Sequence, residues 1–229
     1  MRRRDLQARL LALHAGDPFA HVIAAANEHR RKHGTACGLY PAGPHVMRLA
    51  ATLARAAGAQ RILDLGTGFG YSALWLAATA ATAHVEAVDQ FEEHLSRARE
   101  FAQAAGLQHR IEFIHAEAAE YLGRTAGPYD LIHDDAWFGR QPAYFDRVVQ
   151  LLKPGGVLSM PNWFLLEDAL SGTRYRRWAA FAGPNWPAAT LAYAEQLARD
   201  PRLHVTWTQA PPLGIAIKRS AHPDRGPQR

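Results

Sequence analysis

Short apolar runs alternate with longer stretches of helical spacing along most of the chain. This alternation is typical of a parallel β-sheet whose strands are joined by crossover helices. The apolar runs predict seven strands, at Arg61–Leu65, His84–Asp89, Arg110–His115, Tyr129–Asp135, Gly156–Met160, Leu203–Thr208 and Leu213–Lys218. The predicted fold class is therefore α/β, with a doubly wound, mostly parallel, seven-stranded sheet.

The pattern changes towards both ends of the chain. Residues 1–58 show helical spacing broken by turn-forming stretches at Gly38–Pro41 and Ala42–Pro44, which predicts a helical cap ahead of the first strand. The last two strands meet at Pro211–Pro212 with a short connection, so we expect them to be antiparallel to each other at one end of the sheet. We expect a single domain over residues 1–229, with an α/β core at 59–220 and a tail at 221–229.

Residues 162–187 interrupt the alternation. The segment contains Trp163, Trp178 and Trp186 together with glycines and prolines, and it shows no clean periodicity. A helix is predicted after it, at Ala188–Ala198. An irregular, aromatic-rich segment of this length is consistent with a lid over a substrate site.

The composition fits a globular protein. Of 229 residues, 48% are hydrophobic and 21% are charged, which is enough apolar material for a buried core and excludes disordered, collagen and coiled-coil classes. The single Cys37 excludes an internal disulfide, and no apolar run approaches the roughly 18 residues of a membrane span. Polar residues follow Met1–Arg4 directly, unlike a signal peptide. We expect a cytoplasmic protein without a membrane partner.

The positive charge is modest. There are 26 Lys and Arg against 21 Asp and Glu, a formal net charge of +5. Part of the excess lies in the expected terminal tails, at Arg2, Arg3, Arg4, Arg225 and Arg229. The remaining basic residues form no dense stripe, so we do not expect a nucleic-acid partner.

A glycine-rich loop gives the strongest chemical signal. The first strand runs through Asp64 into Gly66-Thr67-Gly68-Phe69-Gly70, and Tyr71 and Ser72 begin a predicted helix. Glycines let the backbone approach a ligand, and the amides at a helix start favour a carboxylate or a phosphate. Tyr71 stands where a dinucleotide fingerprint requires its third glycine, and no Gly-Lys-Ser/Thr follows. Both a nicotinamide cofactor and a P-loop nucleotide are therefore disfavoured.

The second strand ends in an acidic residue, Asp89. A carboxylate at this edge of the sheet can accept hydrogen bonds from two ribose hydroxyls, which indicates a ligand that carries a nucleoside. The alternative is that Asp89 only caps the helix predicted at Phe91–Ala105.

Taken together, these motifs resemble the S-adenosylmethionine-dependent methyltransferases, specifically the catechol and caffeoyl-CoA O-methyltransferase-like family. The resemblance covers most of the chain. It rests on Gly66-x-Gly68-x-Gly70-Tyr71-Ser72, Asp89, Ala116-Glu117-Ala118, Tyr129-Asp130-Leu131-Ile132 running to Asp135, Leu151-Leu152-Lys153-Pro154-Gly155-Gly156-Val157, Asp200-Pro201-Arg202 and Gly214-Ile215-Ala216-Ile217-Lys218.

The resemblance implies S-adenosylmethionine as the cofactor, a seven-stranded doubly wound sheet and a homodimer. It places Ser72 at the methionine carboxylate, Asp89 at the ribose, Glu117 near the adenine and Trp137 packed nearby. The implied cofactor-binding residues are Asp64, Gly66, Thr67, Gly68, Gly70, Tyr71, Ser72, Asp89, Gln90, Glu117, Ala118, Asp135 and Trp137.

The family's metal site is only partly present. By resemblance, Asp135 and Asn162 correspond to two ligands of a divalent cation such as Mg²⁺, but Pro161 stands in place of the second aspartate. A proline offers only its carbonyl, and losing a carboxylate weakens a site for a hard cation. Asp134 could substitute only if the strand ends before Asp135, because alternation otherwise turns these two side chains apart. Phe138 replaces a lysine that many members have, which argues for a more apolar acceptor.

A hydroxyl acceptor must lose its proton during methyl transfer. Without a complete metal site, Asp135 and His133 are the candidate bases, because positions i and i+2 share one face of a strand. The alternative for His133 is a buried, hydrogen-bonded core histidine. Aromatic residues could form walls for a flat substrate, or else pack the lid; they are Trp137, Phe138, Trp163 and Phe164.

His29 and His33 have the i, i+4 spacing of a zinc site, but Arg30, Arg31 and Lys32 lie between them, so we interpret this stretch as a solvated basic helix face. The function predicted is S-adenosylmethionine-dependent O-methylation of a small, aromatic, hydroxylated substrate, and whether it uses a divalent cation at Asp135 and Asn162 is left open. The alternatives are a tRNA hydroxyuridine methyltransferase, since the same basic cluster could contact RNA, and a methyltransferase fold that binds cofactor but has lost its reaction centre.

Overall fold

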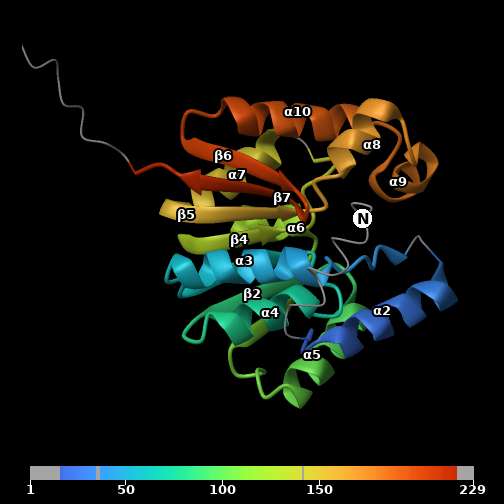
Figure 1. Cartoon of the computed structure of the whole chain (residues 1–229), viewed down its shortest axis with the longest axis vertical. Helices are drawn as coiled ribbons and strands as arrows, with labels where there is room; N and C mark the ends of the chain where they lie inside the picture. The colour runs from blue at the N-terminus through green and yellow to red at the C-terminus, as the bar shows by residue number, and fades with distance from the viewer. Residues whose placement is uncertain (1–15, 35–36, 141, 221–229) are drawn as a thin grey trace, which may run out of the picture.

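Seven strands form one sheet through the middle of the molecule (Figure 1). The structure is a computed structural model that describes residues 16–34, 37–140 and 142–220. The spatial order of the strands is β3-β2-β1-β4-β5-β7-β6. Their bounds are β1 Arg61–Leu65, β2 His84–Asp89, β3 Ile111–His115, β4 Tyr129–Asp134, β5 Leu152–Pro161, β6 Leu203–Gln209 and β7 Pro212–Lys218.

The sheet is mostly parallel, as the sequence predicted. Strands β1 to β5 pair in parallel, and β7 pairs antiparallel with both β5 and β6. The predicted antiparallel pair at one end of the sheet is therefore confirmed. Strand order reverses on either side of β1, and in open α/β sheets a ligand crevice forms at such a point, beyond the carboxyl ends of the strands.

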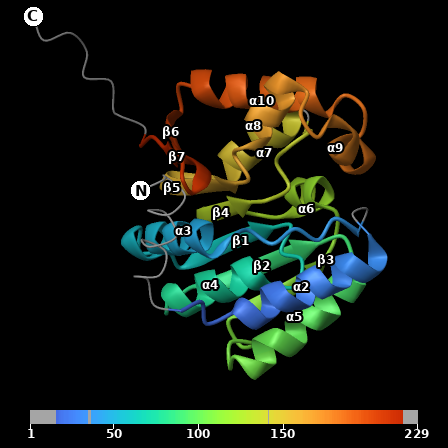
Figure 2. The same cartoon turned by 45° about the vertical axis from the view of Figure 1, so that its right-hand side comes forward.

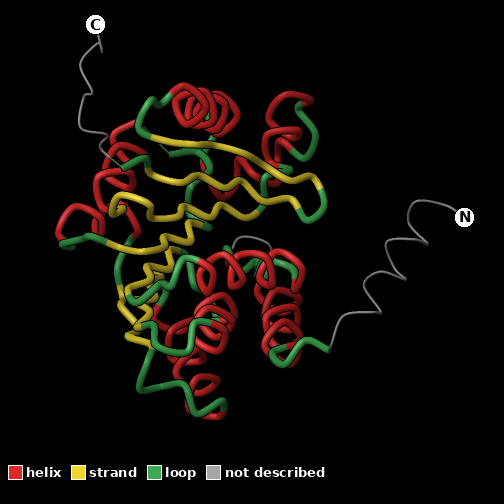
Figure 3. The backbone as a smooth tube through the Cα atoms, turned by 60° about the vertical axis from the view of Figure 1, so that its left-hand side comes forward, coloured by secondary structure: helices red, strands yellow, loops and turns green. Residues whose placement is uncertain are grey.

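Helices cover both faces of the sheet, and the tube in Figure 3 shows them on either side of the strands. Buried residues of α2 to α5 form the core on one face, and buried residues of α6 to α10 form the core on the other. The helix bounds are α2 Ala20–His33, α3 Pro44–Ala56, α4 Tyr71–Thr79, α5 Glu92–Ala104, α6 Ala118–Arg124, α7 Pro142–Leu151, α8 Leu165–Ser171, α9 Tyr175–Ala182 and α10 Trp186–Arg199.

In the described part of the segment expected to be a helical cap, residues 16–34 and 37–58, lie the helices α2 and α3. Helix α3 begins at Pro44, and the missing N–H of proline costs no hydrogen bond there, because the first N–H groups of a helix have no partner within the helix. The buried face of α3 packs on the same side of the sheet as α4. In Figures 1 and 2, α2 lies beside α5 at one end of the molecule. Residues 1–15 and the predicted tail at 221–229 lie outside the described residues, and the division at residue 58 stays a prediction.

Several element boundaries differ by one or two residues from those predicted, and three differences bear on the site. Residues 162–187 are not irregular, because they contain α8, α9 and the start of α10. Helices α8 and α9 are short and end at Gly172 and Gly183, so the helical spacing of apolar residues is interrupted and does not show in the sequence. Strand β5 begins at Leu152, ahead of the predicted Gly156, and β4 ends at Asp134 rather than Asp135. Across the described ranges, no helix is both long and apolar enough to cross a membrane.

Candidate active site

A cavity of about 590 Å³ lies beyond the carboxyl ends of the parallel strands. Its wall includes the residues that directly follow β1, β2, β3, β4 and β5. Helix α2 contributes Val22, Ala26 and Arg30, while α9 contributes Trp178 and Ala182. Segments far apart in the sequence therefore meet around one space.

The glycine loop forms one wall of this cavity. Gly66 and Gly68 have positive φ angles of 83° and 55°, in the left-handed region that favours glycine. A Cβ atom on Gly68 would lie 2.7 Å from Leu39 Cδ1, so a side chain there would displace its neighbour. Thr67, Tyr71 and Ser72 also line the cavity, as predicted for this loop. The loop thus exposes backbone to the space where a ligand can bind.

Gly70 has a different place from the one predicted. It is the left-handed N-cap of α4, with φ 80°, and a Cβ atom there would lie 3.0 Å from Ala98 Cβ on α5. It is absent from the cavity wall. The third glycine therefore serves the packing of α4 against α5, which is a structural role that sequence spacing alone does not distinguish from ligand contact.

Asp89 is buried at the cavity and tied to the loop. Its Oδ2 accepts a hydrogen bond from the N–H of Gly68 at 2.8 Å, and its Oδ1 accepts one from the N–H of Phe91 at 3.0 Å. His94 Nδ1 lies 3.3 Å from the same Oδ1. The capping alternative is wrong, because the N-cap of α5 is Phe91. Asp89 and the adjacent Gln90 both line the cavity, so this carboxylate can reach a ligand.

The third strand delivers an acidic residue to the same wall. Glu117 is the N-cap of α6, and its side chain accepts hydrogen bonds from the N–H groups of Ala119 and Glu120. Arg140 Nη2 lies 2.7 Å from Glu117 Oε1, and both residues line the cavity, as does Ala118. The predicted Glu117 and Ala118 are thus in place, whereas sequence analysis missed Arg140, which belongs to no motif.

Asp64 lies behind the loop and is fully buried. Ser72 Oγ donates a hydrogen bond to Asp64 Oδ2 at 2.6 Å, while Asp64 Oδ1 has no partner. Burial raises the pKa of Asp64 to about 6 from an ordinary 3.8. A buried carboxylate with one unpaired oxygen costs stability, and such groups concentrate at functional sites. Asp64 is absent from the cavity wall, and its predicted contact with the cofactor stays a prediction.

The raised pKa of Asp64 predicts that Asp64→Asn increases the free energy of unfolding by an amount that grows with pH. Between pH 3.8 and 6 the folded chain keeps a proton that the unfolded chain has lost, so stability falls as pH rises through this window. The neutral variant escapes this loss. Its free energy of unfolding should exceed that of wild type by about 1 kcal/mol at pH 4.5 and about 3 kcal/mol at pH 8. Urea unfolding of cofactor-free protein measures the difference, and a gain independent of pH would contradict the argument.

Asp135 and Asn162 meet at the cavity, at the ends of β4 and β5. Asn162 Nδ2 donates a hydrogen bond to Asp135 Oδ1 at 2.7 Å, and both residues line the cavity. Burial raises the pKa of Asp135 well above its usual range, against the opposing effect of the Asn162 hydrogen bond. The predicted pairing of these two side chains is therefore present.

The residues at this position do not match a resident hard-cation site. Pro161 takes the place of the second carboxylate, and its carbonyl accepts a hydrogen bond from Trp137 Nε1 at 2.8 Å. Asp134 does not substitute: its Oδ1 accepts from Tyr144 Oη at 2.9 Å and its Oδ2 from Tyr193 Oη at 3.5 Å. One carboxylate and one amide remain, fewer than the oxygen ligands that such ions usually require. We therefore derive no chemical step through a metal.

His133 is not brought to the cavity. Its side chain is fully buried in the sheet, where Nδ1 lies 3.1 Å from Ser159 Oγ on β5, and it is absent from the cavity wall. Burial lowers its pKa to about 4. The expected pairing with Asp135 fails because β4 ends at Asp134, so the alternation of side chains does not continue to residue 135. His133 is therefore a buried core histidine, the alternative to a catalytic base.

The predicted aromatic walls divide into two pairs. Phe138 and Phe164 line the cavity, together with Trp178, whose ring centroid is 6.0 Å from that of Phe138 and 6.4 Å from that of Phe164. Trp137 and Trp163 are buried behind the wall, with centroids 5.2 Å apart. Trp137 is thus in the core rather than at the predicted cofactor pocket.

Sequence analysis also missed residues on the acceptor side. Tyr40 packs against Trp178 with ring centroids 5.7 Å apart, and the guanidinium of Arg30 lies 4.9 Å from the centroid of Tyr40. Arg174 Nη2 pairs with Asp168 Oδ1 at 2.8 Å. Only Trp178 could have been noticed, as a tryptophan inside the predicted lid. Arg30 lies on α2, Tyr40 in the segment between α2 and α3, and Arg174 directly ahead of α9, so only the fold brings them to this wall.

Comparison with known proteins decides the family. The family profile described as O-methyltransferase matches residues 43–213, which include all of the strands from β1 to β6 and most of the cavity wall. The chain belongs to the O-methyltransferase family. The catechol and caffeoyl-CoA O-methyltransferase-like resemblance is therefore confirmed, and the protein is an O-methyltransferase by family.

Relatives and solved structures agree with this assignment. A protein of Mycolicibacterium vanbaalenii that carries an O-methyltransferase name is 32% identical over 205 residues, covering 87% of this chain and 85% of its own. A SAH-bound methyltransferase of Podospora anserina superposes with a TM-score of 0.76 at 20% identity, covering 96% of this chain and 98% of its own. An O-methyltransferase of Bacillus cereus in complex with SAH gives 0.70 at 22% identity, with 90% and 93% covered. These structures show that the O-methyltransferase shares their fold.

Proposed function

We propose that this O-methyltransferase transfers the methyl group of S-adenosylmethionine to a hydroxyl of a small aromatic acceptor, without a metal. One observation carries the proposal. A single cavity joins the glycine loop and Asp89 to Asp135 and to an aromatic wall that includes Phe138 and Phe164. Cofactor and acceptor can therefore lie against each other in one space, as direct methyl transfer requires.

The cofactor side of the cavity supplies complementary groups. Asp89 can accept hydrogen bonds from both ribose hydroxyls while it holds the loop through the N–H of Gly68. Ser72 and the free N–H groups at the start of α4 can bind the methionine carboxylate. Glu117 lies where it can face the adenine. Bound S-adenosylmethionine supplies an activated methyl group on its sulfonium, so the protein must provide position and a proton acceptor.

The acceptor side orients a flat ring and takes its proton. An aromatic acceptor can lie against Phe138, Phe164 and Trp178, because these side chains line the cavity beside Asp135. The Asp135 carboxylate can accept the hydroxyl proton, and the Asn162 amide holds that carboxylate in place. The neighbouring carboxylate, Asp134, does not share this role, because its oxygens accept hydrogen bonds from Tyr144 and Tyr193.

Transfer of label from methyl-labelled S-adenosylmethionine into a pool of hydroxy-aromatic compounds tests the proposal. We expect the same rate, within about twofold, with Mg²⁺ and with excess EDTA, because the donor set at Asp135 lacks a second carboxylate. Transfer only with Mg²⁺ would overturn the metal-free part of the proposal. Cofactor binding with no transfer to any compound would overturn the reaction, and salt-sensitive transfer to tRNA would replace the acceptor class.

A further inference from the structure

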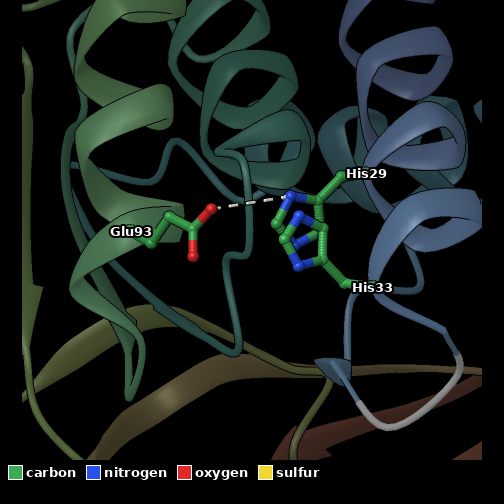
Figure 4. A group of neighbouring side chains, drawn as sticks. All are labelled: His29, His33 and Glu93. Atoms are coloured by element: carbon green, nitrogen blue, oxygen red, sulfur yellow. Dashed lines mark ion pairs between the residues drawn. The ribbon is translucent and has the colours of Figure 1, made fainter.

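A second group of side chains lies outside the cavity, between α2 and α5. Figure 4 shows the imidazole rings of His29 and His33 on α2 lying one over the other and facing the carboxylate of Glu93 on α5. One possible ligand atom from each residue lies within 4.8 Å of the others. His33 and Glu93 are 60 positions apart in the sequence, so only the fold brings these three groups together.

The spacing of the possible ligand atoms can be compared with that around a bound zinc ion. The two rings are stacked, with centroids 4.2 Å apart and planes at 17°. His29 Nδ1 lies 3.8 Å from Glu93 Oε1. Ligands of a tetrahedral zinc ion lie roughly 3.3–3.5 Å apart, given bonds of about 2.0–2.2 Å. The His29 side chain is 11% exposed and that of Glu93 is 70% exposed, so a rigid imidazole faces a carboxylate that is free to close the remaining distance.

Three basic residues lie near the two histidines, and two of them pair with a carboxylate on the same helix. Arg31 and Lys32 both pair with Glu28, and Arg30 Nη2 donates a hydrogen bond to Asn27 Oδ1 at 2.7 Å. Glu28 offsets one of these positive charges. Arg31, Lys32 and His33 are exposed, as expected for a solvated basic face, whereas His29 is half-buried and Arg30 lines the main cavity.

Space for an ion and its further ligands is present. The three residues line a second cavity, of about 410 Å³, which is also lined by Cys37, Glu92 and His94. Burial and the neighbouring His33 lower the pKa of His29, which favours the neutral imidazole, the form that binds metal. A water molecule would complete the coordination.

We propose that His29, His33 and Glu93 bind one transition-metal ion, Zn²⁺ in particular, that joins α2 to α5. Two imidazoles and a carboxylate are a common ligand set for zinc, whereas Mg²⁺ and Ca²⁺ prefer oxygen ligands alone. The i, i+4 spacing on one helix face is the usual way in which a helix supplies two histidines.

The site adjoins the cofactor's side of the protein. The His29 ring centroid lies 5.5 Å from that of His94, and His94 Nδ1 lies 3.3 Å from Asp89. Helix α2 also supplies Val22, Ala26 and Arg30 to the wall of the main cavity. An ion between α2 and α5 would therefore fasten one wall of the active site, a structural role separate from the chemistry at Asp135.

Metal binding by the full, untagged protein tests the site without reference to activity. Chelator-treated protein should bind one equivalent of Zn²⁺, and Co²⁺ should give the visible absorption of a tetrahedral ion. We expect His33→Ala and Glu93→Gln each to weaken Zn²⁺ binding at least about tenfold, since each removes one of three ligands. Zn²⁺ should also raise the thermal unfolding temperature of wild type but not of His33→Ala, because an ion that binds only the folded state stabilises it.

His84→Ala is the matched control. His84 Nε2 lies 3.7 Å from Glu112 Oε2, which is a histidine–glutamate pair of almost the same separation but without a second histidine. This variant should bind Zn²⁺ within about twofold of wild type. Wild-type affinity in either His33→Ala or Glu93→Gln would overturn the three-residue site, and so would the absence of binding at micromolar Zn²⁺ in wild type. Because none of these results depends on methyl transfer, failure of the metal site is distinguishable from failure of the proposed function.

Discussion

Replacing Asp135 by Asn is expected to lower kcat by about 10²- to 10⁴-fold, the usual contribution of a positioned general base. The amide keeps the size of the side chain and can still accept the hydrogen bond from Asn162 Nδ2, so the cavity wall should be preserved. It cannot take the proton of the acceptor hydroxyl. The affinity for SAH should stay within about threefold of wild type, because the change removes a function of the reaction rather than of cofactor binding.

Asp134→Asn is the control for this prediction. Asp134 is the adjacent residue and is fully buried, but its oxygens accept hydrogen bonds from Tyr144 and Tyr193 and it does not line the cavity. The Asn side chain can keep one of these hydrogen bonds, and turnover should remain within about threefold of wild type. Steady-state kinetics and calorimetric SAH titration measure both variants. Equal losses in the two would show that Asp135 acts through the fold rather than in the reaction.

Asp89→Ala is expected to weaken SAH binding by about 100-fold. The carboxylate is proposed to accept two hydrogen bonds from the ribose, and hydrogen bonds to charged groups contribute about 1.5–3 kcal/mol each. A loss of about 3 kcal/mol corresponds to a factor of about 100 in Kd. The variant also leaves the N–H of Gly68 without its 2.8 Å partner, which loosens the loop that carries the rest of the site.

Two further variants separate ribose recognition from loop damage. Asp89→Asn keeps one acceptor oxygen and should lose less affinity than Asp89→Ala. Glu112→Ala removes an exposed carboxylate on the neighbouring strand β3 and should leave SAH affinity within about twofold of wild type. Calorimetric titration gives the affinities, and circular dichroism shows whether each variant is folded. Unchanged affinity in a folded Asp89→Ala protein would contradict the ribose assignment.

The sequence predicted the central strands closely because their limits are set locally. The bounds of β1 and β2 agree with those predicted, since each strand is an apolar run that stops at a residue unsuited to continue it, at Gly66 for β1 and at Asp89 for β2. The glycine loop, the acidic end of β2 and the antiparallel final pair also depend on short-range patterns. By contrast, β5 begins at Leu152, ahead of Pro154 and two glycines that local rules read as a turn. These three residues pair with neither neighbouring strand and shift the register between β4 and β5, and Gly155 has a φ of 78°, so the local turn signal is present inside the strand and only the pairing of Leu152 with Tyr129 extends the strand before it.

The division of the candidate site into lining and buried residues was decided by tertiary contacts. Local alternation could not show that Asp134 turns towards Tyr144 and Tyr193, which come from α7 and α10 and leave Asp135 alone at the cavity. The same holds for His133, whose place in the sheet depends on Ser159 of β5.

The sequence by itself determined the fold class, the order of motifs and the family, because these follow from periodicity and from short runs of residues. Only the tertiary structure decided which side chains share a space. Glu93 meets His29 and His33 because α5 packs beside α2, and Arg140 reaches Glu117 because the loop after β4 passes the start of α6. Such contacts depend on how helices far apart in the sequence pack on a common sheet, and no local sequence pattern determines that packing.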